Sequence, residues 1–179
     1  MTKPVLVMAI GNESRGDDAL GPLLARRLTA WLDGTECSEA VEVIEEFQLQ
    51  VEHALDLQGR TLVLFVDAGE GLPAPFRFYE AAPRRPAGHT THALVPEALL
   101  GIYTTVQNAS PPPAFVLCIA GMSFELGEPL SPPGQRHLEE AFAFCRQLLQ
   151  APAGHAWHEQ ARAASDGMTR GQTSGEIAA

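Results

Sequence analysis

The stretch VLVMAIGNESRGDDALGPLLARRLTAWL, residues 5–32, decides the fold. Its first six residues are all apolar, which is typical of a strand that is covered on both faces of a parallel sheet. From residue 20 onward the apolar side chains recur with helical spacing, while Arg26 and Arg27 fall on the opposite face. A buried strand followed at once by an amphipathic helix predicts the opening unit of an α/β fold.

Similar apolar runs and helical patterns alternate through the rest of the chain. The other predicted strands are residues 41–47, 61–66, 76–79 and 114–120, and the other predicted helices are residues 51–57, 96–106 and 132–149. The runs TLVLFV and FVLCIA are apolar nearly throughout, which indicates strands buried on both faces of a mostly parallel sheet. The run FRFYE alternates instead, and so predicts a shorter or edge strand.

Length and composition predict one folded domain and a tail. A chain of 179 residues, 45% of them hydrophobic, can bury one core, and we place that domain at residues 1–150. Residues 151–179 contain few large apolar side chains and many Gly, Ala, Ser and Thr. This composition predicts a poorly ordered tail.

Charge and cysteine usage exclude several classes of partner and location. The chain has 22 acidic residues against 12 Lys and Arg, and its net charge of −10 argues against nucleic acid or an anionic membrane as partner. Cys37, Cys118 and Cys145 are far apart, with no C-x-x-C spacing, which favours reduced thiols in a cytoplasmic protein. We expect neither a membrane span nor a signal peptide, because no apolar run reaches 18 residues and the N-terminus leads directly into a strand pattern.

Three residues of metal-ligating types are expected at one edge of the sheet. Asp18 follows the first strand, Asp67 ends the run TLVLFVD, and His92 precedes the helix that begins near residue 96. In open α/β sheets, sites gather beyond the carboxyl ends of the strands. Two carboxylates and an imidazole there are suitable ligands for a borderline divalent ion such as nickel or zinc.

Each of these residues also has a simpler structural role available. Asp17 or Asp18 could cap the first helix, Asp67 could be a turn residue at a strand end, and His92 could lie on the surface. One carboxylate of the adjacent pair can anchor the helix start while Asp18 faces the sheet edge. Only the coincidence of all three residues at one edge favours the metal site.

Other catalytic motifs are missing from the sequence. It contains no H-E-x-x-H, no G-x-S-x-G and no Walker A motif. Gly11, Gly16 and Gly21 follow the first strand, but not with the G-x-G-x-x-G spacing of a dinucleotide loop. Asp17 and Asp18 would also repel a pyrophosphate, which weighs against a nucleotide cofactor.

Taken together, the motifs resemble those of the [NiFe] hydrogenase maturation proteases. The signature G-N-x-x-x-x-D-[DE]-x-x-G corresponds to Gly11, Asn12, Asp17, Asp18 and Gly21. The stretches FVDAG, THALVPEALL and GMSFELGEPLSP resemble the later motifs of the family, in the same order. The resemblance covers about residues 5–149.

The resemblance implies a fold, a reaction and a ligand set. The implied fold is an α/β sandwich with a twisted five-stranded sheet between helices. The implied activity is removal of a C-terminal peptide from the large-subunit precursor of a [NiFe] hydrogenase after nickel insertion, with the nickel supplied by that substrate. Asp18, Asp67 and His92 would be the residues that contact nickel, acting in recognition or directly in catalysis.

Two departures from the family pattern and one nearby residue bear on this assignment. Asp18 stands where some members have glutamate, and Val95 stands where a serine is often expected. His89, three residues before His92, is a second candidate for the imidazole ligand. Two other functional classes stay open on the sequence: a metal-independent binding or chaperone module, and a stand-alone metallohydrolase that holds its own zinc.

Overall fold

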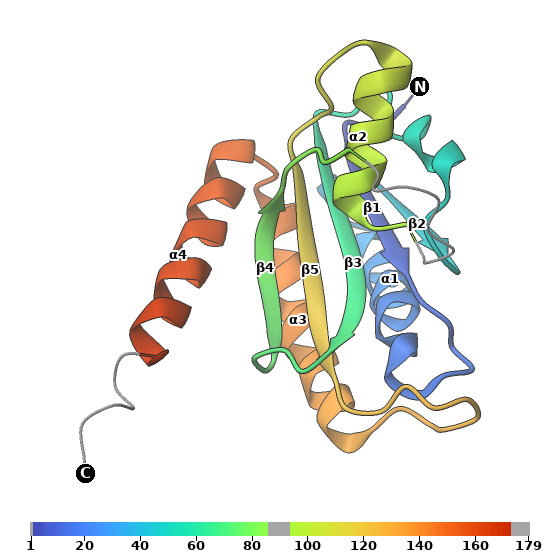
Figure 1. Ribbon diagram of the computed structural model, residues 1–179, viewed down its shortest axis with the longest axis vertical. Coiled ribbons are helices and arrows are strands. Elements are labelled where there is room, and N and C mark those ends of the chain that lie inside the picture. The colour runs from blue at the N-terminus through green and yellow to red at the C-terminus, as the bar shows by residue number, and fades with distance from the viewer. Residues whose placement is uncertain (1, 86–93, 173–179) are drawn as a thin grey trace.

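Five strands form one sheet in the computed structural model, which describes residues 2–85 and 94–172, with side chains described up to residue 165 (Figure 1). The strands are β1 (Val5–Ile10), β2 (Val41–Glu46), β3 (Leu62–Glu70), β4 (Phe76–Ala81) and β5 (Ala114–Gly121). The helices are α1 (Leu20–Leu32), α2 (Pro96–Gln107), α3 (Pro132–Gln150) and α4 (Gly154–Gln172). Short 3-10 helices are η1 (Gly16–Ala19), η2 (Glu36–Glu39) and η3 (Val51–Ala54).

The sheet is mostly parallel, with the strand order β2-β1-β3-β5-β4. Strand β1 runs parallel to β2 and β3, and β3 runs parallel to β5, whereas β4 pairs antiparallel with β5 at the edge. The predicted α/β class, the five-stranded sheet and the edge position of the FRFYE run are therefore confirmed. The parallel order brings the carboxyl ends of β1, β2, β3 and β5 to one edge of the sheet.

Helices cover both faces of this sheet, as the apolar runs predicted. Figure 1 shows α2 in front of the sheet and α1 and α3 behind it. Val7 and Leu64 belong to the core that faces α1 and α3, while Met8 and Phe65 belong to the core that faces α2. All four of these side chains are fully buried. Neighbouring strand residues thus enter opposite cores, which explains why β1 and β3 are apolar at consecutive positions.

Two predicted elements differ in extent by three residues or more in the structure, and the other bounds agree within two residues. The helix expected over residues 51–57 is only the single turn η3, and Val51 and Leu55 are exposed rather than buried. Strand β3 continues three residues beyond Asp67, because its ladder with β5 extends to the pair Glu70 and Gly121. Asp67 therefore lies within the strand and not at its end, and it faces Cys118 on β5.

The prediction of a poorly ordered tail is wrong for the chain just after Gln150. Helix α4 lies beside β4 (Figure 1), and its Trp157 is fully buried. The indole nitrogen of Trp157 donates to the carbonyl oxygen of Leu148 at 3.1 Å, and the indole packs edge-on against Phe115. A few buried side chains, above all Trp157, dock an otherwise polar helix, an effect that average composition hides. Residues 173–179 of the predicted tail lie outside the described residues.

None of the helices in the described parts of the chain is both long enough and apolar enough to cross a membrane.

Candidate functional site

A pocket of about 250 Å³ lies at the carboxyl edge of the sheet, between the β1–α1 loop and the segment that follows β2. It contains Asp18 and Asp67, two of the three residues that the sequence placed there. The full lining is Ile10, Gly11, Asn12, Arg15, Asp18, Phe47, Gln48, Leu49, Asp67 and Leu94. The two residues thus lie at the edge of the sheet that the strand-end rule indicated, and their role in a functional site stays a prediction.

Asp18 lies in η1, the single turn that directly precedes α1, and its side chain lines the pocket. The loop that carries it folds tightly onto the end of β1, since a Cβ atom on Gly11 would lie 2.0 Å from the carbonyl oxygen of Asp18. This close approach explains why the opening motif has glycine at residue 11. The Asp18 side chain is half-buried, and no hydrogen bond to its carboxylate is formed by the residues that the structure describes.

Asp67 projects into the same pocket from β3. Burial raises the pKa of its carboxyl group to about 6, the hydrogen bond from the Ala68 amide at 2.8 Å opposes that rise, and the negative charge of Asp18 adds to it. The two carboxylates are therefore close enough to repel each other. A bound cation would relieve both the repulsion and the cost of burying the Asp67 charge.

Asp17 has a different role from its neighbour and is fully buried. Its carboxylate accepts hydrogen bonds from the Met122 amide, the Ser131 amide and the Ser131 hydroxyl, each at 2.7 Å, and a longer one from the Ser123 amide. Burial raises the pKa of Asp17, but these hydrogen bonds outweigh that effect and the net pKa lies below the usual range. Asp17 thus stays ionised and holds the β5–α3 loop.

This arrangement corrects the expectation that one carboxylate of the pair anchors the start of its own helix. The side chain of Asp17 makes no cap hydrogen bond to η1 or α1. It lies instead against the first turn of α3, where a Cβ atom on Gly134 would be 2.6 Å from its Oδ1 atom. The glycine at residue 134 therefore makes room for the carboxylate.

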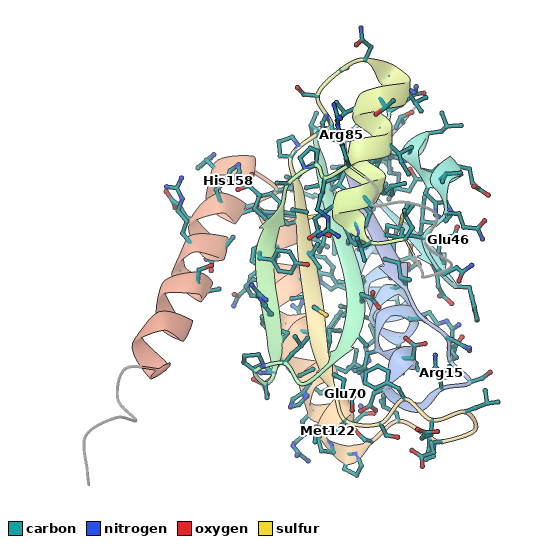
Figure 2. All side chains as sticks on the ribbon, in the orientation of Figure 1. Arg15, Glu46, Glu70, Arg85, Met122 and His158 are labelled. Atoms are coloured by element: carbon teal, nitrogen blue, oxygen red, sulfur yellow. The ribbon has the colours of Figure 1, made fainter. Side chains whose placement is uncertain are left out.

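Backbone hydrogen bonds also join the β1–α1 loop to the β5–α3 loop. The Asp17 amide donates to the Ser123 carbonyl at 2.8 Å, and the Gly127 amide donates to the Ser14 carbonyl at 2.7 Å. Figure 2 shows Arg15 and Met122 on these two loops, at the same end of the sheet. Asp18 therefore lies on a loop whose backbone is hydrogen-bonded to the β5–α3 loop. Such a fixed position suits a residue that must hold a ligand in place.

The third predicted ligand, His92, and its neighbour His89 lie outside the described residues. Within residues 2–85 and 94–165, no group of three or more His, Cys, Asp or Glu side chains is arranged to hold a metal ion. Asp18 and Asp67 thus line one pocket, and the role of all three residues as metal ligands stays a prediction. Val95, the residue before α2, has an extended backbone and makes no side-chain cap.

Several pocket residues were not singled out in the sequence. Phe47, Gln48 and Leu49 follow directly after β2, so the strand-end rule that selected Asp18 and Asp67 also applies to them. They carry no carboxylate, imidazole or thiol, so nothing in their sequence indicates a place in a metal site.

Cys118 lies beside Asp67 in the ladder between β3 and β5. Burial, together with the charge of Asp67, raises the pKa of its thiol to about 12. A thiol with such a pKa is protonated at neutral pH and is a poor nucleophile. The nearest cysteine to the candidate site is therefore unsuited to nucleophilic catalysis.

Comparison with known proteins agrees with the resemblance at the level of the fold. No protein-family model and no curated protein sequence matches the chain. Solved structures do match, among them the [NiFe] hydrogenase maturation protease HycI from Thermococcus kodakarensis, with 24% identity and a TM-score of 0.60 over 83% of this chain and 93% of that one. The hydrogenase maturating endopeptidase HybD from E. coli matches with 18% identity and a TM-score of 0.62, over the same shares of the two chains.

A third structure, the maturation protease HybD from Thermococcus kodakarensis, matches with 17% identity and a TM-score of 0.58, over 81% of this chain and 98% of that one. The chain thus spans nearly the whole length of these proteins and has their fold. The fold that the motif resemblance implied is confirmed.

Proposed function

We propose that this chain is an endopeptidase that removes the C-terminal extension from the large-subunit precursor of a [NiFe] hydrogenase after nickel has been inserted. One observation carries the proposal: Asp18 and Asp67 share an open pocket at the carboxyl edge of a sheet whose fold is that of known hydrogenase maturation proteases. A metal-independent binding module would not need two mutually repelling carboxylates there.

In this proposal, Asp18, Asp67 and His92 contact the nickel that the precursor presents. Three protein ligands leave coordination positions free for groups of the substrate. By binding the nickel, these ligands would distinguish a precursor that carries nickel from one that does not. The same contact would bring the scissile peptide to the pocket, where the metal can polarise a carbonyl or position a water molecule. The Asp18 and Asp67 carboxylates favour a cation at this point over any anionic group.

The same proposal places the reaction in the cytoplasm. The sequence supports this location through its cysteine usage, and Cys37, Cys118 and Cys145 are all free thiols. The net charge of −10 disfavours nucleic acid and anionic lipid as partners, which leaves the precursor protein as the partner that we propose.

Replacing His92 with alanine is the residue-level test of the proposal. We expect this variant to lose processing of the nickel-loaded precursor while it unfolds at the same temperature as the wild type, because a ligand at the sheet edge contributes little to the core. The product is measured as a loss of mass from the precursor. His89→Ala is the matched control and should retain processing. If His92→Ala processes normally and His89→Ala does not, the imidazole role belongs to His89.

A further inference from the structure

The segment between β2 and β3 exposes three large apolar side chains within nine residues. Phe47 is 64% exposed, Val51 60% and Leu55 57%. Scattered apolar residues are common on protein surfaces, but several on one short segment indicate a surface that another molecule covers. We call Phe47, Val51 and Leu55 the apolar strip.

The apolar strip is continuous with the candidate site. Phe47 is at once the first residue of the strip and part of the wall of the pocket that holds Asp18 and Asp67. Figure 2 shows Glu46, the residue just before Phe47, on the same side of the molecule as Arg15, another residue that lines the pocket. A molecule bound in the pocket with the two carboxylates therefore lies against a wall that includes Phe47.

The charged residues on the segment that carries the strip are acidic, while Arg15 on the β1–α1 loop lines the pocket together with Phe47. Glu46, Glu52 and Asp56 alternate with its apolar residues along the chain. No lysine or arginine occurs between residues 41 and 59, and the next arginine, Arg60, is paired with Glu42. A partner that fits this surface has an apolar patch bordered by lysine or arginine side chains.

We propose that the apolar strip is the docking surface for the folded body of the nickel-carrying precursor, next to the point where its C-terminal extension enters the pocket. This inference rests on the proposed function. A pocket of about 250 Å³ holds only a few residues of peptide, so it has little area for recognising a whole protein. Exposed aromatic and aliphatic side chains with a charged rim are the usual centre of such an interface.

The test replaces the part of the strip that lies outside the pocket. The variant Val51→Ser/Leu55→Ser leaves Phe47, Asp18 and Asp67 untouched. Val106→Ser is the matched control, because Val106 is 62% exposed near the end of α2 and does not line the pocket. Steady-state cleavage of the nickel-loaded precursor gives kcat and KM, and an optical biosensor gives the Kd for the same precursor.

We expect Val51→Ser/Leu55→Ser to raise KM and Kd about tenfold with kcat nearly unchanged, as the loss of a moderately important contact does. Val106→Ser should match the wild type. If the wild type cleaves the precursor and Val51→Ser/Leu55→Ser has the same KM and Kd as the wild type, the docking inference is wrong while the proposed function stands. If the wild type neither binds nor cleaves the precursor, both fail.

A second copy of this chain is the alternative occupant of the strip, and sedimentation distinguishes it. A wild type that dimerises and a Val51→Ser/Leu55→Ser variant that is monomeric, with unchanged KM for the precursor, would assign the strip to self-association and overturn the proposal.

Discussion

Replacing Asp67 with asparagine is expected to stabilise the protein at neutral pH and to make it inactive. Burial raises the pKa of Asp67 from 3.8 to about 6, so its ionised form is disfavoured in the folded state. A rise of this size corresponds to about 3 kcal/mol of stability lost when the carboxyl group ionises. Asparagine keeps an oxygen that can accept the hydrogen bond from Ala68 and has no charge to bury.

The sign of the pH dependence follows from the same shift. Between pH 4 and 6 the folded protein holds a proton on Asp67 that the unfolded chain has released, so the contribution of Asp67 to stability falls as the pH rises through this range. The variant Asp67→Asn lacks this fall. Urea unfolding at pH 4 and pH 7.5 measures it, and Asp33→Asn, at an exposed aspartate, is the control that should behave as the wild type.

Activity should change in the opposite direction to stability in Asp67→Asn. A neutral amide is a far weaker ligand for a divalent ion than a carboxylate, and we expect processing of the nickel-loaded precursor to fall about a hundredfold or more. The combination of a more stable protein and a slower reaction would show that the buried charge is retained for function. A variant that is both less stable and fully active would contradict this assignment.

Replacing Asp17 with alanine should have the largest effect on stability of any substitution at this edge. The buried Asp17 carboxylate accepts four hydrogen bonds, and its removal leaves the Met122 and Ser131 amides without their acceptor. Buried donors that lose a charged acceptor cost about 3 to 5 kcal/mol together. The free energy of unfolding, from urea titration at pH 7.5, is the measurement.

The neighbouring residue provides the matched control. Asp18→Ala removes the same side chain one position along the chain, but there the carboxylate is half-buried and accepts no hydrogen bond from the described residues. We expect this variant to unfold within about 0.5 kcal/mol of the wild type, as surface changes usually do, and to lose processing. Similar stability losses in Asp17→Ala and Asp18→Ala would mean that the structural and ligand roles are not divided between the two residues.

The elements that could be predicted from the sequence are those whose structure is determined by residues within one short stretch. Strand β1 shows its burial on both faces in six consecutive apolar residues, and its predicted bounds agree with the structure. The role of Asp17 could not be predicted in this way. Its hydrogen-bond donors, Met122 and Ser131, are 105 and 114 residues away in the chain, and only the folded sheet brings the two loops together.

Helix α4 shows a second kind of limit. The segment after Gln150 is mostly small and polar, and it docks through a few contacts, chiefly those of Trp157 with Phe115 and of His158 with Glu80. The average composition of residues 151–179 gives no sign of these contacts. For the candidate site, the strand-end rule placed Asp18 and Asp67 in one pocket, but a search for ligating groups left out the apolar wall that Phe47 provides.

Cleavage of nickel-loaded and metal-free precursor, compared side by side, tests the central claim most directly. Both forms are incubated with metal-free protein, with and without added free nickel, and the products are resolved by mass. We predict cleavage only of the precursor that already carries nickel, because a metal presented by a docked protein has the high effective concentration of an intramolecular contact, which free nickel lacks. Equal cleavage of both forms would contradict a sensing role for Asp18, Asp67 and His92, and cleavage of neither would favour a binding module.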